Sequence, residues 1–507
     1  MKKRNILILL AAAAGLASCN MDKMPYDAIP DTEALTSPTD FSNMREGLYT
    51  GLRSMVGGDY SAQTIQGDEF NAVNGFSNTL GDAYRWDFTN SYGTAESIYA
   101  SYESLINRAN FILQGYNKCD MSNTVLFTDA AKATMKVIKG ECFFTRAYSL
   151  FYLAQYFCAD YEASTADEAQ SGVSYRLDYN PSSDKSTYPS RNTLNETVKQ
   201  IKADLDSAAA YITTAGTPAS PRITVDAVTA LRARLALWQD DYAAAAKYAS
   251  SLIEEGNYAL CEVDADLEDM WQQDGGMESI VQFAIASSSE SASQLGVRYL
   301  PYNTDGIPDY LPTQSTIDLF SDDDYRKSVY FAETTVTTST GTSGDVYVFN
   351  KFIDHTRVWS EIGAQAEGFR FVIEPKMFRI AEMYLIAAEA YAQAGDLTNA
   401  NKYLKELQEN RIMDLDYKDY TSKNTFMAEL RNEREREMMG EGTRLFDLKR
   451  WHLGVKRGTP QQSDLCNLPG STTTTALDKT ATDYRLVWPI PKSETDANPN
   501  VKQNPGY

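Results

Sequence analysis

The apolar residues of this chain recur at helical spacing, and in one long stretch they do so on two faces of the same helix. Over residues 94–112 the intervals between apolar residues are four, three, four and three, and Thr94 is a suitable N-cap. Over residues 131–157 there are two stripes: Gly140, Phe143, Ala147, Leu150, Ala154 and Phe157 on one, and Phe144, Tyr148 and Phe151 on the other. Because a helix that is apolar on two faces needs neighbours on two sides, the pattern predicts stacked helical pairs.

A weak internal repeat also favours stacked pairs. Asp240-Asp241-Tyr242 with Ala245, and Gly395-Asp396-Leu397 with Ala400, each mark a turn between two segments of helical pattern. The second turn is flanked by large and small residues at positions similar to those of a tetratricopeptide repeat, namely Tyr384, Ala388, Tyr391 and Leu404. Since one pair cannot bury its apolar face alone, we expect about four pairs, with helices near 131–157 and 194–212 among them. The predicted fold class is all-α, a superhelical scaffold of tetratricopeptide-like pairs with long loop-rich insertions.

Three regions are expected to be loop-rich. They span residues 54–93, 159–191 and 261–367, and the last contains a short strand-like run at 279–283. Long loops on a rigid scaffold are where binding residues are usually found. We therefore expect ligand contacts to come from these insertions.

The N-terminus is predicted to be a lipoprotein signal peptide over residues 1–18. Lys2, Lys3 and Arg4 precede an apolar run at 6–16, which is shorter than the roughly 20 residues that span a bilayer. The run ends in Leu16-Ala17-Ser18-Cys19, which resembles a bacterial lipobox. This pattern predicts acylation of Cys19 and a tether over 19–38. The alternative is an ordinary signal peptide with a chance cysteine.

The charge balance argues against nucleic acid as a partner. The chain has 47 Lys and Arg against 69 Asp and Glu, which gives a formal net charge of −22. Such a surface repels phosphate backbones and anionic lipid headgroups. We interpret the acidity as a source of solubility for a surface-exposed protein.

Neither a metal nor a cofactor is predicted. Apart from Cys19, the cysteines are Cys119, Cys142, Cys158, Cys261 and Cys466, and they form neither a Cys-x-x-Cys motif nor a Cys/His cluster. Cys142 and Cys158 lie in or next to the helix with two apolar stripes and are expected to be small core residues. Asp322-Asp323-Asp324 lacks the glycine and distal glutamate of a calcium loop, so a turn or helix start is expected there.

Catalytic motifs are also missing from the sequence. His355 and His452 are its only histidines, and no nucleophile elbow, His-Glu-x-x-His motif or phosphate loop occurs. A glycosidase needs only two carboxylates, so this absence does not exclude hydrolysis.

Several passages resemble the SusD/RagB family of outer-membrane lipoproteins. They lie at 379–390, 433–451 and 488–507, with shorter matches at 140–148 and 324–326. The cluster of passages is specific, whereas any one of them alone would not be. Residues in these passages include Arg379, Glu382, Tyr384, Glu389, Glu433, Arg434, Glu437, Glu441, Gly442, Arg444, Phe446, Asp447, Arg450, Trp451, Trp488, Pro489, Ile490, Pro491 and Asn504. The resemblance extends from the lipobox to the last residue.

The resemblance implies a fold, a location and a function. It implies an N-terminal region over 39–225 and a C-terminal region over 226–507, packed as one compact body. Family members lie on the outer-membrane surface, cap a SusC-like TonB-dependent transporter, and hand it glycans or, in some cases, peptides. The resemblance also argues against an enzyme, so no catalytic residue is assigned.

The passages that resemble the SusD/RagB family are expected to have structural roles. On the helix that contains Glu433, Arg434, Arg436 and Glu437, alternating charges predict ion pairs across a helix surface. The Trp-Pro-Ile-Pro and Asn-Pro elements of the tail are expected to hold an extended segment against the body.

Glycan contacts are expected from exposed aromatic side chains in the loops. The C–H faces of a sugar stack on a ring, while neighbouring amides and charged groups bond its hydroxyls. The candidates are Trp86, Tyr92, Trp271, Tyr299, Tyr302 and Tyr310, with Trp86 first because it lies in an otherwise polar loop.

The predicted function is capture of an oligosaccharide at the cell surface and its delivery to a SusC-like transporter. The alternatives are a peptide-capturing RagB-like lipoprotein, a surface glycoside hydrolase, and a purely structural cap of the transporter. The sequence does not identify the sugar, the linkage or the chain length.

Overall fold

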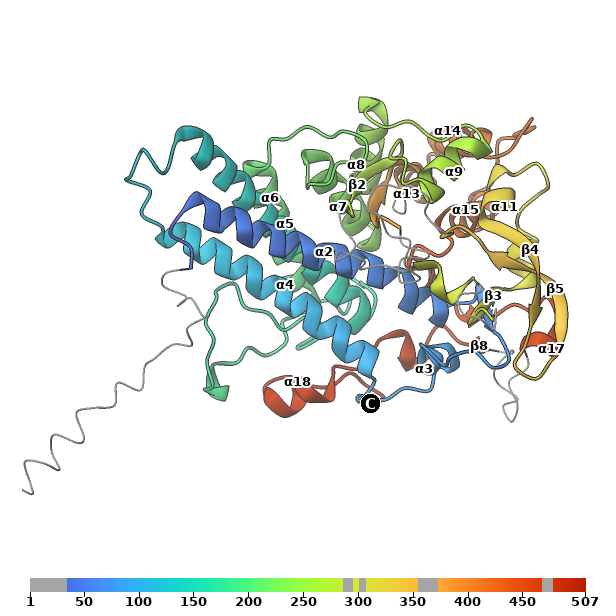
Figure 1. Ribbon diagram of the computed structural model, residues 1–507, viewed down its shortest axis with the longest axis horizontal. Helices are drawn as coiled ribbons and strands as arrows, with labels where there is room; N and C mark the ends of the chain where they lie inside the picture. Colours follow the sequence, from blue (N-terminus) through green and yellow to red (C-terminus); the bar gives the residue numbers. More distant parts are fainter. Residues whose placement is uncertain (1–33, 286–294, 301–306, 354–372, 467–476) are drawn as a thin grey trace, which may run out of the picture.

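Long helices form most of the molecule in the computed structural model, which describes residues 34–285, 295–300, 307–353, 373–466 and 477–507 (Figure 1). The long helices are α2 (Pro38–Gln66), α4 (Gly93–Lys118), α5 (Asp129–Phe157), α6 (Leu194–Tyr211), α7 (Val225–Trp238), α8 (Tyr242–Glu255), α13 (Ile380–Gln393), α14 (Leu397–Glu409) and α15 (Lys423–Met438). Each packs against the next in a continuous array, α2 to α4, α4 to α5, and so on to α8, which packs on α13. The mainly helical prediction is confirmed.

The internal repeat in the sequence corresponds to two similar helix pairs. In the α7–α8 turn, Asp240 has a φ of 57°, and the next residue, Asp241, caps α8 by accepting from the Ala244 amide at 3.2 Å. In the α13–α14 turn, Gly395 has a φ of 86°, and Asp396 caps α14 through the Asn399 amide at 3.1 Å. A left-handed residue followed by an Asp cap therefore builds both turns.

The short helices are α3 (Gly81–Arg85), α9 (Asp264–Gln272), α10 (Gln314–Ile317), α11 (Tyr325–Tyr330), α16 (Arg444–Arg450), α17 (Ser463–Cys466) and α18 (Lys492–Ala497). Antiparallel strand pairs are β1 (Phe70–Ala72) with β3 (Tyr310–Pro312), β2 (Ser279–Gln282) with β6 (Lys376–Arg379), β4 (Phe331–Thr337) with β5 (Ser343–Phe349), and β7 (Val455–Lys456) with β8 (Asp478–Lys479). Several short elements, among them α11, α17, β4 and β5, gather at one end of the molecule, whereas α18 lies away from them (Figure 1).

The first part of one predicted loop region, 54–93, is helical. Residues 54–66, expected to be irregular, form the second half of α2, which continues through Gly57 and Gly58. The helix persists because Val56, Tyr60 and Ile65 on it are buried in the core, and this packing outweighs the low helix propensity of glycine. The strand at 279–282 was predicted, whereas the β4–β5 hairpin was not.

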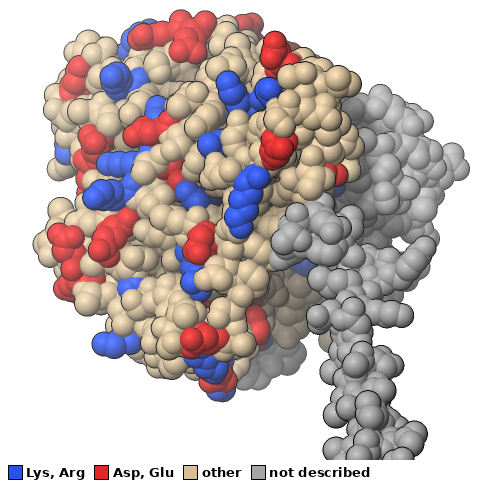
Figure 2. Space-filling model, turned by 90° about the vertical axis from the view of Figure 1, so that its left-hand side faces the viewer, with Lys and Arg blue, Asp and Glu red and all other residues tan. Residues whose placement is uncertain are grey.

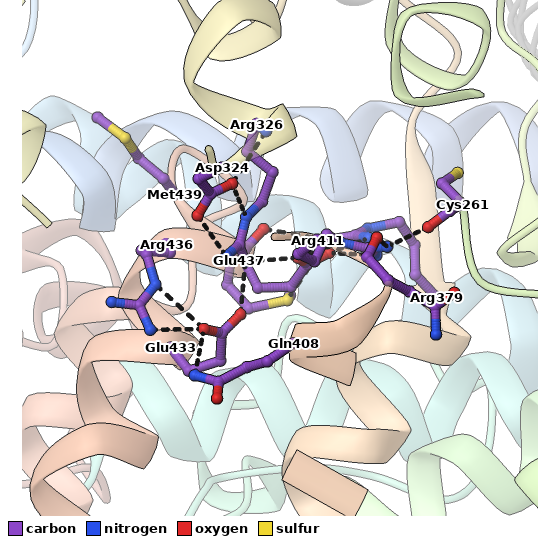
Figure 3. Close-up of polar contacts among 12 residues, drawn as sticks. Cys261, Asp324, Arg326, Arg379, Gln408, Arg411, Glu433, Arg436, Glu437 and Met439 are labelled. Carbon is purple, nitrogen blue, oxygen red and sulfur yellow. Dashed lines mark hydrogen bonds and ion pairs between the residues drawn. The ribbon is translucent and has the colours of Figure 1, made fainter. Parts of the chain in front are cut away.

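The charged residues of α15 form a buried network rather than surface ion pairs (Figure 3). Glu437 accepts from Arg379 Nη1 at 2.8 Å, from Arg411 Nε at 2.9 Å and from Arg326 Nη1 at 3.0 Å. Burial alone would raise the pKa of Glu437, but the three guanidinium groups outweigh it and hold this pKa well below its usual value. The expectation of an exposed, laced helix face was wrong, because the partners come from α11, β6 and the segment after α14.

The C-terminal tail packs on the helical body as expected, with α18 as a short helical interruption. Trp488 is buried, its backbone N–H donates to Tyr156 O at 2.8 Å, and its Nε1 donates to Gln66 Oε1 at 2.7 Å. Asn504 Nδ2 donates to Phe157 O at 2.8 Å and to Trp488 O at 2.7 Å. The tail thereby joins the ends of α2 and α5.

Candidate ligand-binding groove

Most of the aromatic residues predicted to bind glycan lie in the interior. Trp86, Tyr92, Trp271, Tyr299 and Tyr310 are all buried, with at most 8% of any of them exposed. Tyr302 and Cys19 lie outside the described residues. The exposure on which the prediction depended is therefore absent for five of the six rings, and direct contact of these positions with glycan stays an untested prediction.

Trp86 and Trp271 have clear packing roles. The Trp86 indole lies among Leu445, Val455 and other apolar residues, and its Nε1 donates to Gln66 O at 2.9 Å. The Trp271 ring lies under three cations, with Lys351 Nζ at 4.3 Å, Lys376 Nζ at 4.9 Å and Arg379 Cζ at 5.3 Å from its centroid. Both tryptophans are therefore packed in the interior beneath the loops and do not project into solvent.

Tyr92 is the predicted residue that borders a hollow. The hollow has a volume of about 420 Å³, and Asn78, Asp82, Thr94 and Ser97 line it beside Tyr92. It is shallow, and Tyr92 itself stacks on Phe88 at 5.2 Å. The aromatic surface that it offers to a ligand is therefore small.

A groove of similar volume runs along α4, and its partly exposed rings were not among the predicted site residues. It has a volume of about 400 Å³ between α4, the segment 174–189 and α18. Residues of this α4 groove include Tyr99, Glu103 and Asn107 from α4, Tyr175, Tyr179 and Tyr188 from the segment, and Glu494 and Asn498 from the tail. The only signal in the sequence was the tyrosine content of the predicted loop 159–191.

A second hollow extends the α4 groove toward the C-terminal end of α4. It has a volume of about 430 Å³ and shares Tyr179 and Pro181 with the first. Phe111 borders it and packs on Tyr179 with ring centroids 4.9 Å apart. Because Tyr99, Glu103, Asn107 and Phe111 are four apart, one stripe of α4 follows both hollows.

Hydrogen bonds from side chains to backbone carbonyl groups hold the segment 174–189, the outer wall of the α4 groove, in place. Asn498 Nδ2 donates to Pro189 O at 2.9 Å, and Asn110 Nδ2 donates to Arg176 O at 2.9 Å. Tyr188 Oη donates to Ser182 O at 2.8 Å, which fixes its ring across the segment. The wall is therefore positioned by side chains of α4 and of the tail, two elements far apart in the sequence.

Two carboxyl groups face this groove. Burial, and next the nearby charge of Glu494, raise the pKa of Glu103 from 4.5 to about 8. Burial also raises the pKa of Glu494, although a hydrogen bond from Asn498 opposes the shift. Glu103 Oε1 is buried and has no hydrogen-bond partner among the described residues.

Glu103→Gln is expected to remove a pH-dependent loss of stability. Because the folded-state pKa of Glu103 is raised, its contribution is fully present below about pH 4.5 and is lost as the pH rises toward 8. A glutamine cannot ionise, so the variant should gain melting temperature over the native protein at pH 8 and little at pH 5. Thermal unfolding between these values tests this, with the exposed Glu96→Gln on the same helix as control. Parallel melting curves at all pH values would contradict the assignment.

The described residues offer binding groups and no evident reactive centre. Among them, no cluster of three or more His, Cys, Asp or Glu side chains could hold a metal ion. His452 is exposed, 3.1 Å from Glu162, and does not line the α4 groove. Within the same residues, no helix combines the length and apolarity needed to cross a bilayer. On the face shown in Figure 2, acidic and basic side chains are interspersed rather than gathered into a basic patch.

Two family models match the chain. The model described as "SusD family" matches residues 329–507, and the model described as "Starch-binding associating with outer membrane" matches residues 21–237. Association with the outer membrane is thus part of the description of the second model. No curated protein matches.

Solved structures share the fold over nearly the whole length. A SusD superfamily protein from Bacteroides thetaiotaomicron is 23% identical with a TM-score of 0.76, covering 93% of this chain and 100% of that one. A SusD-like carbohydrate binding protein from Bacteroides vulgatus is 19% identical with a TM-score of 0.72, covering 92% and 97%. Proteins of this family are non-catalytic binding proteins. The chain belongs to the SusD/RagB family.

Proposed function

We propose that this protein captures oligosaccharides at the outer-membrane surface and delivers them to a SusC-like TonB-dependent transporter. The observation that carries the proposal is the α4 groove, in which partly exposed tyrosines lie beside amide and carboxyl groups. Tyrosine rings offer flat apolar faces for the C–H surface of a sugar, and the polar groups can bond its hydroxyls.

The related proteins support a carbohydrate ligand. One family model is described as starch-binding, and a solved relative is named a carbohydrate binding protein. Lipid attachment at Cys19 would hold the binding body at the membrane, next to a transporter. The regions 39–225 and 226–507 would act together, because α6 and α7 pack across their boundary.

Tyr188→Ala is expected to weaken glycan binding by about tenfold, since a ring at the centre of a contact commonly contributes more than 1 kcal/mol. Affinity electrophoresis against polysaccharide panels, followed by calorimetry on the glycan found, measures the change. Tyr188→Phe keeps the ring and should retain most of the affinity. Tyr347→Ala removes a partly buried tyrosine from the β4–β5 hairpin, away from the groove, and should change nothing in binding.

Three other results would contradict the proposal. Binding of peptides alone would favour the peptide-capture alternative. Release of shorter sugars from a bound glycan would indicate a hydrolase. Transporter binding without any ligand would leave a structural cap as the function.

A further inference from the structure

We propose that Glu103 and Glu494 form a subsite in the α4 groove for the protonated amine of an amino sugar. The inference rests on the proposed function, because it names the class of glycan that the groove would select. It depends on the cavity, on the state of the Glu103 carboxyl group, and on the positions of the basic side chains around it.

The Glu103 side chain is partly buried, and one of its carboxyl oxygens lacks a hydrogen-bond partner in the part of the chain that the structure describes. It lines the groove from α4, and its Oε1 is buried with no hydrogen-bond partner among the described residues. Burial raises the pKa of Glu103, and the charged group that further raises it is another acid, Glu494. The Oε1 atom of Glu494 accepts a hydrogen bond from Asn498 Nδ2 at 3.1 Å. Buried acids in proteins are usually paired or fully hydrogen-bonded, so this pair lacks a positive group.

The basic side chains around the groove are engaged elsewhere. On the segment 174–189, Arg176 Nε lies 3.6 Å from Asp178 Oδ1, and Lys185 Nζ donates to Asp496 O at 3.1 Å. On α18, Lys492 Nζ pairs with Asp496 Oδ2 at 2.6 Å. On α4, the exposed Arg108 donates to Gly47 O at 3.0 Å. None of these four contacts brings a cation to Glu103.

A protonated amine on a sugar ring supplies what the pair lacks. An ammonium group carries a positive charge and three donors. Its arrival lowers the raised pKa of Glu103 and favours the carboxylate form, so the amine can bond to both carboxyl groups while the ring lies against tyrosine. The face of a tyrosine also attracts a nearby cation. An N-acetylated sugar lacks the positive charge and keeps a single N–H donor, and the anionic group of a uronic acid or sulfated sugar would meet two acids instead of a cation.

Calorimetric titration of the purified protein with a matched pair of ligands tests this subsite. The pair is a β-linked glucosamine oligosaccharide and its fully N-acetylated counterpart of equal length, both at pH 6.5. We expect a roughly tenfold preference for the free amine, as for a charge-assisted contact in a partly desolvated site. Glu103→Gln and Glu494→Gln should each remove most of that preference.

Glu96→Gln is the matched control. It lies on the same helix, is exposed, does not line the α4 groove and carries the same Glu-to-Gln change, so the preference should remain. Thermal unfolding of each variant verifies folding. Equal affinity for both ligands with native binding to neutral glycans would overturn the subsite and leave the proposed function intact. Binding to neither ligand nor any other glycan would overturn both. Stronger binding of a lysine peptide than of the glucosamine oligosaccharide would overturn the assignment to a sugar.

Discussion

Glu437→Gln is expected to lower the free energy of unfolding by about 3–5 kcal/mol, because removing one member of a buried charge network leaves the others unpaired. Three guanidinium groups, those of Arg326, Arg379 and Arg411, donate to this carboxylate (Figure 3). The side chains of Glu437, Arg326 and Arg411 have no exposed surface, so water cannot replace the lost charge. A glutamine has nearly the same shape, so the loss would be electrostatic.

Urea unfolding of the variant and of a matched surface variant measures this effect. Glu409 pairs with Lys405 at 3.6 Å across one turn of α14, with about half of each side chain exposed, at 49% and 46%. Such a pair contributes about 0.5 kcal/mol or less, so Glu409→Gln should unfold almost like the native protein. If the two variants unfolded alike, the buried network would not contribute as inferred.

The same network is expected to lose part of its stabilising effect in acid. Burial raises the pKa of Glu433, but Arg326 and Arg436 outweigh it and lower this pKa to about 2. A lowered folded-state pKa means that the stabilisation is present above about pH 4.5 and is lost as the pH falls toward 2. The network and Glu103 therefore limit stability from opposite ends of the pH range.

Local patterns in the sequence predicted the helices and their pairing. The stripes on residues 131–157 predicted α5 with neighbours on two sides, and it packs on both α4 and α6. The turn residues Asp241 and Asp396 predicted two similar pairs because a cap depends only on residues within one helical turn. Such features need no knowledge of distant parts of the chain.

The buried network could not be predicted in the same way. Glu437 meets Arg411, Arg379 and Arg326 across sequence separations of 26, 58 and 111 residues. On one helix, alternating charge is the usual sign of a solvated face, and it favoured that interpretation. Only the tertiary packing of α11, β6 and α15 turns those charges inward.

The exposure of the candidate aromatic residues was mispredicted for a related reason. Polar neighbours suggested that the Trp86 loop stands in solvent, whereas α16, β7 and the segment before α18 cover its indole. The tyrosines of the segment 174–189 were not among the predicted site residues, yet they remain partly exposed beside α4 and the tail. Burial of a loop aromatic depends on what packs over it, which a local pattern does not contain.

Trp86→Ala is expected to destabilise the fold by about 3–5 kcal/mol, as large-to-small changes of a buried tryptophan usually do. The substitution would leave a cavity next to Leu445, Val455 and Leu486, and would leave Gln66 O without its 2.9 Å hydrogen bond. Trp86→Phe keeps much of the apolar contact and should lose less. The φ of 57° at this position is unfavourable for both native and variant side chains, so it contributes little to the difference.

Trp86→Ala and Tyr188→Ala should therefore have opposite effects, and together they locate the binding surface. If the α4 groove binds glycan, Trp86→Ala lowers the unfolding midpoint and leaves the dissociation constant of the folded protein unchanged. Tyr188→Ala then raises the dissociation constant and leaves the unfolding midpoint nearly unchanged, because its ring is already partly exposed. If Trp86→Ala instead raised the dissociation constant of the folded protein and Tyr188→Ala did not, the Trp86 loop would be the ligand-binding surface. Measuring both quantities on both variants separates a residue that supports the scaffold from one that contacts the ligand, a distinction that binding data alone cannot make when the variant is partly unfolded.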